Sequence, residues 1–296
     1  MEPVIQCRNL RHSYNGKKQV LNNLNFTVEA GKIFGLLGKN GAGKSTTINI
    51  LMGFLEPTSG DCRIFGEPSY NISPQTRTRI GLLHEGHLQY EFMSIAQIDR
   101  FYSGFYAKWN RDVYYELMEK LGLPHNHKIF RMSCGQRSQV ALGLIMAQDP
   151  DLMILDDYSM GLDAGYRRLF LDYLAKFVRE RKKTALVTSH IVQDMEQLVD
   201  DIIILNKGKV IVQSSLKEFQ QGLRHYRFTS PDKGKGLHAD EVIANFDAVE
   251  DQVNVFSFHD KEAVEARLKE LQITNSALSE RNMTLEEAFI GLTGKY

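Results

Sequence analysis

One stretch decides the fold of this chain: Gly38-Lys39-Asn40-Gly41-Ala42-Gly43-Lys44-Ser45, which Thr46 follows. Residues 33–37 before it have the apolar pattern of a short buried strand, and residues 47–52 after it have a helical pattern. A glycine-rich loop between a strand and a helix is the context of a phosphate-binding P-loop, where backbone N–H groups and the helix N-terminus face phosphate oxygens. We expect the Lys44 ammonium to reach the β- and γ-phosphates and the Ser45 hydroxyl to bind Mg²⁺.

The composition limits the class of protein. The chain has 296 residues, 43% of them hydrophobic, which is enough for one large domain and a small one. Lys and Arg together number 36, as do Asp and Glu, and the resulting net charge of zero disfavours a nucleic-acid-binding protein. The three cysteines are scattered, which disfavours a zinc site or a disulfide framework and fits a reducing compartment. No apolar run approaches the roughly 20 residues that span a bilayer, so we expect any membrane role to come through a partner chain.

Strand and helix patterns alternate along most of the chain. The ranges with strand patterns before residue 215 are 4–10, 24–29, 33–37, 61–65, 80–84, 152–155, 184–188, 201–205 and 209–212. Helical periodicity dominates from about residue 93 to 147, which predicts a helical insert. This order predicts an α/β fold with a largely parallel sheet and helices on both of its faces.

The composition changes after about Gly222. Strand patterns over 224–230, 248–249 and 253–258, with an amphipathic helix over 261–271, predict a small α+β region. We therefore expect two domains, residues 1–221 with a helical subdomain at about 86–150, and residues 222–296.

Three further polar motifs follow strands or begin helices, and each is common in isolation. Asp156 and Asp157 follow the strand 152–155, which we expect beside the P-loop strand, so that Asp156 can hold Mg²⁺. The stretch Met132-Ser133-Cys134-Gly135-Gln136 begins a helix, and small polar residues there can form an anion site. His190 follows the strand around residues 185–187, which we expect next to the Asp156 strand, with the histidine facing the γ-phosphate.

In this order the motifs resemble the ATP-binding subunit of an ABC transporter over residues 2–215. Residues 283–294 also look like the closing helix of drug-, bacteriocin- and antibiotic-exporting members. The resemblance implies a P-loop NTPase fold of the ABC ATPase type, with a mixed sheet core, a helical subdomain and a small C-terminal α+β appendage. It also implies binding of ATP and Mg²⁺, and hydrolysis of ATP that energises export of a substrate through separate membrane-spanning subunits.

The resemblance gives roles to the residues around the phosphates. Gly38 to Ser45 match the Walker A loop, which with Thr46 binds the phosphates, and Tyr14 matches an aromatic residue that stacks on adenine. Asp156 closes the Walker B strand and, with Ser45, would bind Mg²⁺. Glu85 stands in the place of the Q-loop glutamine, with a role in catalysis and metal binding.

Other matched residues would act in catalysis or across a dimer. Asp157 stands where the family has the base that polarises the attacking water, and His190 matches the switch histidine. The family signature corresponds to Met132 to Gln136, so that Ser133, Cys134, Gly135 and Gln136 would contact a partner's nucleotide. Residues 159–163 match the D-loop, which ends at Asp163.

The resemblance also implies partners. Two nucleotide-binding domains would dimerise head to tail, with each ATP between the Walker A loop of one and the signature of the other. Closure of the dimer would drive a pair of integral membrane subunits, which hold the chain at the cytoplasmic face of the membrane, and hydrolysis would reopen it. The helical insert would dock on those subunits near Glu85. The membrane subunits, and not this chain, would choose the transported substrate.

Three positions depart from the family pattern. Asp157 replaces a glutamate and is one methylene shorter, which places its carboxylate about a bond length farther from the attacking water. We therefore expect slow hydrolysis and a long-lived ATP-bound dimer. Cys134 replaces the first glycine of the signature pair, where its side chain either crowds the partner's γ-phosphate or points away. Glu85 replaces a glutamine and can still bind Mg²⁺ or contact the membrane subunit.

Alternatives remain at the level of function and assembly. A soluble ABC ATPase that acts on nucleic acid or ribosomes is disfavoured by the single P-loop and the zero net charge. An ATP-dependent switch or regulatory ABC protein with slow turnover is the alternative that Asp157 supports. In a homodimer both ATP sites would carry Asp157 and Cys134, whereas in a heterodimer with a standard partner each site would carry one of them.

Overall fold

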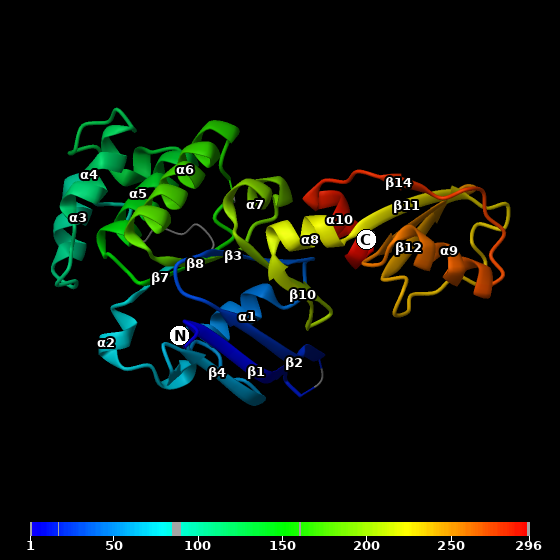
Figure 1. Cartoon of the computed structure of the whole chain (residues 1–296). Coiled ribbons are helices and arrows are strands. Elements are labelled where there is room, and N and C mark those ends of the chain that lie inside the picture. Colours follow the sequence, from blue (N-terminus) through cyan, green and yellow to red (C-terminus); the bar gives the residue numbers. More distant parts are fainter. Residues whose placement is uncertain (1, 17, 85–89, 160, 295–296) are drawn as a thin grey trace. The chain divides into compact units, whose positions relative to one another are not determined.

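The computed structural model describes residues 2–16, 18–84, 90–159 and 161–294 of the chain (Figure 1). The chain forms two compact units, Met1–Gln213 and Ser214–Tyr296. The sequence analysis places a domain boundary after residue 221, whereas here the helix α8 (Leu216–Gly222) belongs to the second unit.

The first unit contains an antiparallel sheet of four strands in the order β2-β1-β4-β5. Its strands are β1 (Ile5–Tyr14), β2 (Lys18–Val28), β4 (Ser59–Ile64) and β5 (Glu67–Pro68). Asn15 and Gly16, between β1 and β2, both have positive φ, as a hairpin turn requires. Because a short turn returns the chain alongside itself, β1 and β2 pair antiparallel. They belong to a sheet that is separate from the largely parallel sheet expected from the sequence.

A second sheet of six strands has the order β10-β9-β3-β8-β7-β6. Its strands are β3 (Ile33–Gly38), β6 (Ile80–His84), β7 (Leu152–Asp156), β8 (Thr184–Val187), β9 (Asp201–Asn206) and β10 (Lys209–Ser215). The pairs β3–β8, β3–β9, β6–β7 and β7–β8 are parallel. β7 and β8 are buried along their whole length, as is usual for parallel strands that are covered on both faces.

The position of β7 corrects one expectation. The strand that ends in Asp156 does not lie beside the P-loop strand, because β8 lies between β7 and β3. The helix α6 (Ala164–Arg181) connects β7 to β8, and such a crossover commonly places the next parallel strand beside the first. β8 is therefore next to β7, as expected, and its carboxyl end lies between Asp156 and the P-loop.

The helix α1 (Lys44–Leu51) lies between the two sheets, where it contacts β2 and β4 on one side and β3 and β7 on the other. A single apolar core joins both sheets to this helix, and its fully buried members include Leu10, Ile48, Ile154 and Leu186. Each such side chain contributes about 1.5–3 kcal/mol when it is removed from water. The helix that follows the P-loop is therefore anchored in the apolar core between the two sheets.

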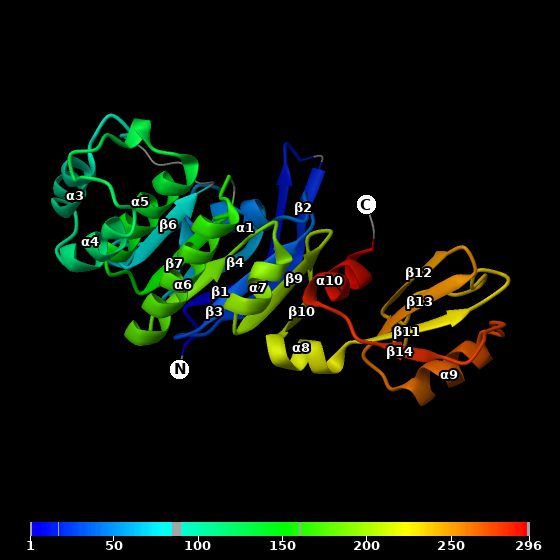
Figure 2. The same cartoon turned by 90° about the horizontal axis from the view of Figure 1, so that it is seen from above.

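The helical insert contains α3 (Ile95–Ser103), α4 (Arg111–Glu119) and α5 (Cys134–Ala147), as the helical periodicity predicts (Figure 2). Ser94 and Gln97 form a capping box at the start of α3, and the Asn110 side chain caps α4. α5 packs against α4 and α6. The first unit also has the short helices α2 (Pro74–Arg77) and α7 (Val192–Leu198).

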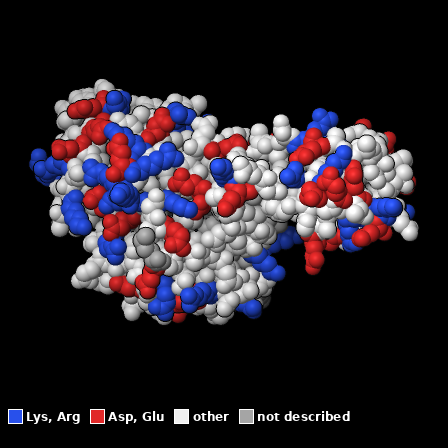
Figure 3. Space-filling view, viewed as in Figure 1, with Lys and Arg blue, Asp and Glu red and all other residues white. Residues whose placement is uncertain are grey.

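No helix of the described residues is long and apolar enough to cross a membrane. On the face shown in Figure 3, basic and acidic side chains are interspersed, and the residues drawn there form no broad area of one charge. This face therefore lacks the basic stripe that would attract a nucleic acid.

The second unit contains an antiparallel sheet in the order β12-β13-β11-β14. Its elements are β11 (Arg224–Thr229), β12 (Asn245–Val249), β13 (Gln252–Ser257), α9 (Lys261–Glu270), β14 (Ser279–Arg281) and α10 (Leu285–Thr293), besides α8. Tyr226 and Val255 of the sheet and Val264 and Leu268 of α9 belong to one buried core. α10 contacts β12 and β13, where Gly291 lies against the Phe256 ring. This is the α+β arrangement that the sequence predicts.

Candidate nucleotide-binding site

The loop between β3 and α1 has the geometry that its glycines permit. Gly41 and Gly43 have φ values of 78° and 106°, a region that side chains with a Cβ rarely adopt. A Cβ at Gly43 would also approach the Leu21 side chain to 2.5 Å, so β2 leaves no room for one. The Lys44 ammonium donates hydrogen bonds to the carbonyl oxygens of Gly38 (2.6 Å) and Lys39 (3.3 Å). The Lys44 side chain thus folds back over the phosphate-binding loop.

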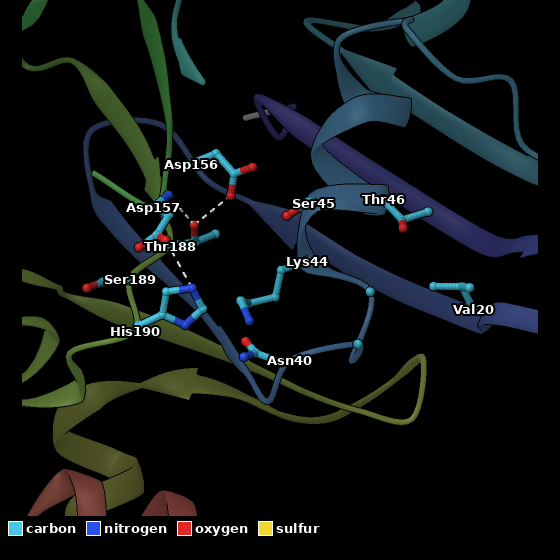
Figure 4. A pocket seen from close by; sticks show the side chains of 12 residues that line it. Val20, Asn40, Lys44, Ser45, Thr46, Asp156, Asp157, Thr188, Ser189 and His190 are labelled. Carbon is cyan, nitrogen blue, oxygen red and sulfur yellow. Dashed lines mark hydrogen bonds and ion pairs between the residues drawn. The ribbon is translucent and has the colours of Figure 1, made fainter. Parts of the chain in front are cut away.

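A pocket of about 320 Å³ opens in front of this loop. Its lining comes from four parts of the chain, which are β2, the P-loop, the end of β7 and the segment after β8 (Figure 4). The lining residues are Val20, Asn40, Gly41, Gly43, Lys44, Ser45, Thr46, Asp156, Asp157, Thr188, Ser189 and His190. In Figure 4, Ser45 and Lys44 lie across the pocket from Asp156, Asp157 and His190. The structure therefore brings the predicted P-loop, Asp156, Asp157 and His190 into one pocket.

Thr188 fixes the two acidic residues at the end of β7. Its hydroxyl donates to Oδ1 of Asp156 (2.8 Å) and accepts the backbone N–H of Asp157 (2.8 Å). Oδ2 of Asp156 has no hydrogen-bond partner among the residues that the structure describes, and Nδ1 of His84 lies 3.6 Å from it. Asp156 is only 2% exposed, and a buried carboxylate oxygen without a partner is costly unless it meets a cation.

These groups fit a divalent cation bound with phosphates. A carboxylate oxygen and a serine hydroxyl are the hard oxygen ligands that Mg²⁺ prefers. Burial lowers the pKa of Lys44, and the charges of Asp156 and Asp157 oppose that change. The lysine, the two carboxylates and Ser45 line the same pocket, where they can act on one bound phosphate group.

Asp157 has an unusual backbone and a close partner. It has a positive φ of 47° directly after β7, which turns its side chain into the pocket. Its Oδ2 lies 3.0 Å from Nε2 of His190, and its Oδ1 lies 3.4 Å from the hydroxyl of Ser159. A carboxylate held beside an imidazole is an arrangement that can position and deprotonate a water.

The segment that begins α5 is a regular helix cap in this chain. The Ser133 hydroxyl accepts the N–H of Gln136 (3.2 Å), and the Gln136 side chain accepts the N–H of Ser133 (3.0 Å). A Cβ at Gly161 would lie 2.7 Å from Sγ of Cys134, so the thiol packs against the backbone of residue 161. A Cβ at Gly135 would approach the Tyr166 ring to 2.5 Å, which explains the glycine at that position.

Several predicted site residues lie outside the pocket. The pocket lining does not include Gly38, Lys39 and Ala42 of the P-loop, nor Ser133, Cys134, Gly135, Gln136 and Asp163. Asp163 instead caps α6, where its Oδ1 accepts the N–H of Tyr166 (2.9 Å).

Tyr14 lies at the margin of the pocket. It also does not line the pocket, but its hydroxyl lies 3.3 Å from that of Thr46, which does. Glu85, the predicted Q-loop residue, lies outside the residues that the structure describes.

Apart from the placement of Ser159 in the D-loop, the sequence analysis gave no role to four residues that shape this site. Val20 lines the pocket from β2, and Thr188, Ser189 and Ser159 hold the acidic residues or one another. Thr188 and Ser189 directly precede His190 at the end of a buried strand, and this position in the sequence could have indicated that they lie at the site. Nothing in the sequence distinguishes Val20 from other residues of β2.

Comparison with known proteins decides the family. The sequence pattern of the family described as ABC transporter matches residues 21–159. The Nod factor export ATP-binding protein I of Burkholderia lata is 30% identical over 299 residues, which cover 98% of this chain and 97% of that protein. The chain belongs to the ABC transporter family. The bacitracin transport ATP-binding protein BcrA of Bacillus licheniformis is another relative of this ABC protein, 30% identical over 252 residues, with 80% of this chain and 78% of that protein covered.

Solved structures agree with this membership. An ATP-binding subunit of an ABC transporter has 25% sequence identity and a TM-score of 0.64, and the match covers 74% of this ABC protein and 92% of that chain. A dimeric ATP-binding cassette with bound ADP and Pi, 23% identical, has a TM-score of 0.62 over 72% of this chain and 98% of its own, and supports the fold alone. ABC ATPases in general bind ATP, typically with Mg²⁺, hydrolyse it, dimerise and work with membrane components.

Proposed function

We propose that this chain hydrolyses ATP and thereby energises the export of a substrate through separate membrane-spanning subunits. The observation that carries the proposal is the convergence of Lys44, Ser45, Asp156, Asp157 and His190 on one pocket. The names of the relatives, which are ATP-binding proteins for Nod factor export and bacitracin transport, support export over the alternative of a regulatory switch.

The P-loop would hold the phosphates. Backbone N–H groups at the start of α1, whose N-cap is Gly43, would face the anion, and the Lys44 ammonium would balance the charge on the β- and γ-phosphates. Ser45 and Asp156 would hold Mg²⁺, and Glu85 is the further ligand that the family resemblance suggests. Mg²⁺, when bound, would neutralise negative charge that develops on the phosphate oxygens.

Asp157 would take the proton of the attacking water, with His190 beside it. The aspartate is shorter than glutamate, and its Oδ2 is already engaged with Nε2 of His190 at 3.0 Å. Both facts favour slow turnover, because the efficiency of a general base depends on its reach to the water. We propose that ATP binds tightly and is hydrolysed slowly, so that the closed dimer is long-lived.

The rest of each ATP site would come from a second ABC ATPase subunit. Ser133, Cys134, Gly135 and Gln136 of one chain would face the nucleotide held by the P-loop of the other, with Asp163 near the dimer interface. Tyr14 would stack on the adenine. The packing of Cys134 against Gly161 favours a thiol that points away from the partner's phosphate. The structure describes a single chain, so a homodimer and a heterodimer are both compatible with this proposal.

The helical subdomain, residues 86–150 within the first unit, would dock on the membrane subunits at the cytoplasmic face of the membrane. The second unit, Ser214–Tyr296, would form the accessory domain. The transported substrate would be chosen by the membrane subunits.

Purification from membranes tests this proposal. The tagged full-length chain should co-purify with an integral membrane protein, and the complex should hydrolyse ATP in a Mg²⁺-dependent way. A Lys44→Ala variant should keep the membrane protein and lose ATP hydrolysis, because only the phosphate contact is removed. ATP hydrolysis that Lys44→Ala leaves unchanged, or a chain recovered with ribosomes instead of a membrane protein, would contradict the proposal.

A further inference from the structure

The hydroxyl groups of Ser159 and Ser189 form a short series of hydrogen bonds that ends at the carboxylate of Asp157. Oγ of Ser159 lies 2.8 Å from Oγ of Ser189 and 3.4 Å from Oδ1 of Asp157. Oγ of Ser189 accepts the backbone N–H of Ile191 at 3.0 Å. Ser159 and Ser189 are each 6% exposed, so bulk water is largely kept from these hydrogen bonds.

The chemistry of the groups fixes the direction of this chain of hydrogen bonds. An ionised carboxylate only accepts, so the Ser159 hydroxyl donates to Asp157. Each hydroxyl has one proton, and therefore Ser189 must donate to Ser159. The N–H of Ile191 donates to Ser189, so each of these three hydrogen bonds is donated in the direction of the carboxylate.

Both oxygens of Asp157 are consequently held from different sides. Nε2 of His190 lies 3.0 Å from Oδ2, while Ser159 contacts Oδ1. The backbone N–H of Asp157 is also fixed, by the Thr188 hydroxyl. A short carboxylate with a fixed backbone has few ways to reach a water, so the rotation about its side-chain bonds decides whether it is aimed correctly.

We propose that Ser159 is a positioning residue for ATP hydrolysis, whose hydroxyl, oriented by Ser189, aims the carboxylate of Asp157. This inference rests on the proposed function, because it concerns the same hydrolytic step. Ser159 follows Asp157 by two residues and Ser189 precedes His190, so the hydroxyl pair also ties the segment after β7 to the segment after β8. Small displacements of a reacting group lower the rate strongly, which gives the pair a measurable effect.

The test uses the full-length chain in complex with its membrane subunits. Ser159→Ala should lower kcat for ATP about tenfold, the loss expected for one hydrogen bond to a charged group, and should leave the KM for MgATP within about twofold. Ser159→Thr retains the hydroxyl and should restore most of kcat. Ser189→Ala should lower kcat in the same direction, because it leaves the Ser159 proton unoriented.

Ser69→Ala is the matched control. Ser69 is fully buried, and its hydroxyl has no hydrogen-bond partner in the described part of the chain, so its loss should leave kcat unchanged. Urea unfolding of each variant shows whether a loss of rate reflects a loss of fold. The inference is overturned if Ser159→Ala keeps the wild-type kcat, or if a folded Ser159→Thr loses as much kcat as Ser159→Ala. In either case, ATP hydrolysis by the wild type leaves the proposed function intact. A wild-type complex without ATP hydrolysis overturns both.

Discussion

Oδ2 of Asp157 lies 3.0 Å from Nε2 of His190. The aspartate follows β7 and the histidine follows β8, so the contact joins the ends of two neighbouring parallel strands. Asp157 is 7% exposed, while the imidazole is exposed to solvent at the pocket. The carboxylate is therefore contacted by His190 at Oδ2 and by Ser159 at Oδ1.

Lengthening this carboxylate should speed hydrolysis. Asp157→Glu adds one methylene and brings the carboxylate closer to the attacking water, and we expect kcat to rise about tenfold. Phosphate release at saturating MgATP measures the rate, and the Kd for ATP serves as the control because the P-loop is untouched. A rate equal to or below that of the wild type would show that the length of the residue is not what limits turnover.

Removal of the imidazole should separate binding from hydrolysis. We expect His190→Ala to lower kcat at least about 100-fold, since the group that contacts Asp157 is lost, and to change the Kd for MgATP only a few-fold. His238→Ala provides a control at an exposed histidine of the second unit. If both variants hydrolyse ATP at the same rate, His190 has no part in the reaction.

The sequence predicts the parts of this site that depend on local pattern. The P-loop, its strand and its helix are encoded within residues 33–51, and Asp156 ends an unmistakably apolar run. The strand order could not be predicted in the same way, because it depends on where each crossover returns the chain to the sheet, and in the structure β8 lies between β3 and β7.

Contacts between residues that are far apart in the sequence could not be predicted either. The Thr188 hydroxyl bridges Asp156 and Asp157, which are more than 30 positions earlier, and only the parallel pairing of β7 and β8 brings these residues together. The orientation of the Cys134 thiol is a second case, since it depends on a loop backbone at Gly161.

The packing of Cys134 on Gly161 predicts a coupled pair of substitutions. Gly161 has a φ of 72°, and a Cβ there would lie 2.7 Å from the thiol sulfur. We expect Gly161→Ala to lower the free energy of unfolding by about 1–2 kcal/mol, through backbone strain and the clash. In a Cys134→Gly background the clash is absent, so the cost should shrink by about half. Urea unfolding of the wild type, the two single variants and the double variant measures these free energies. An equal loss of stability in both backgrounds would show that the Cys134 thiol does not pack on Gly161.

Glu67 predicts a pH dependence of stability. Its carboxylate accepts the N–H of Ser73 (2.7 Å) and the hydroxyl of Thr76 (2.8 Å), and these bonds hold the pKa of Glu67 below its ordinary value of 4.5. A lowered pKa in the folded chain means that the unfolded chain binds protons more readily, so the stabilisation is complete above pH 4.5 and is lost as the pH falls through the folded value.

Glu67→Gln should remove this contribution. We expect its urea midpoint to fall less steeply than that of the wild type as the pH is lowered below 4.5, the ordinary pKa of this carboxyl. Glu56→Gln, at an exposed glutamate, should follow the wild-type curve. Parallel curves for Glu67→Gln and the wild type would mean that the Glu67 hydrogen bonds do not contribute to acid sensitivity.

The most direct test of the account compares ATP hydrolysis by three proteins in one assay, each as the full-length chain with its membrane subunits. We predict the order Asp157→Glu, wild type, Lys44→Ala from fastest to slowest, with Lys44→Ala at least about 100-fold below the wild type. A wild-type complex that hydrolyses no ATP, or a Lys44→Ala complex that hydrolyses it at the wild-type rate, would contradict the claim that this pocket is the hydrolytic site.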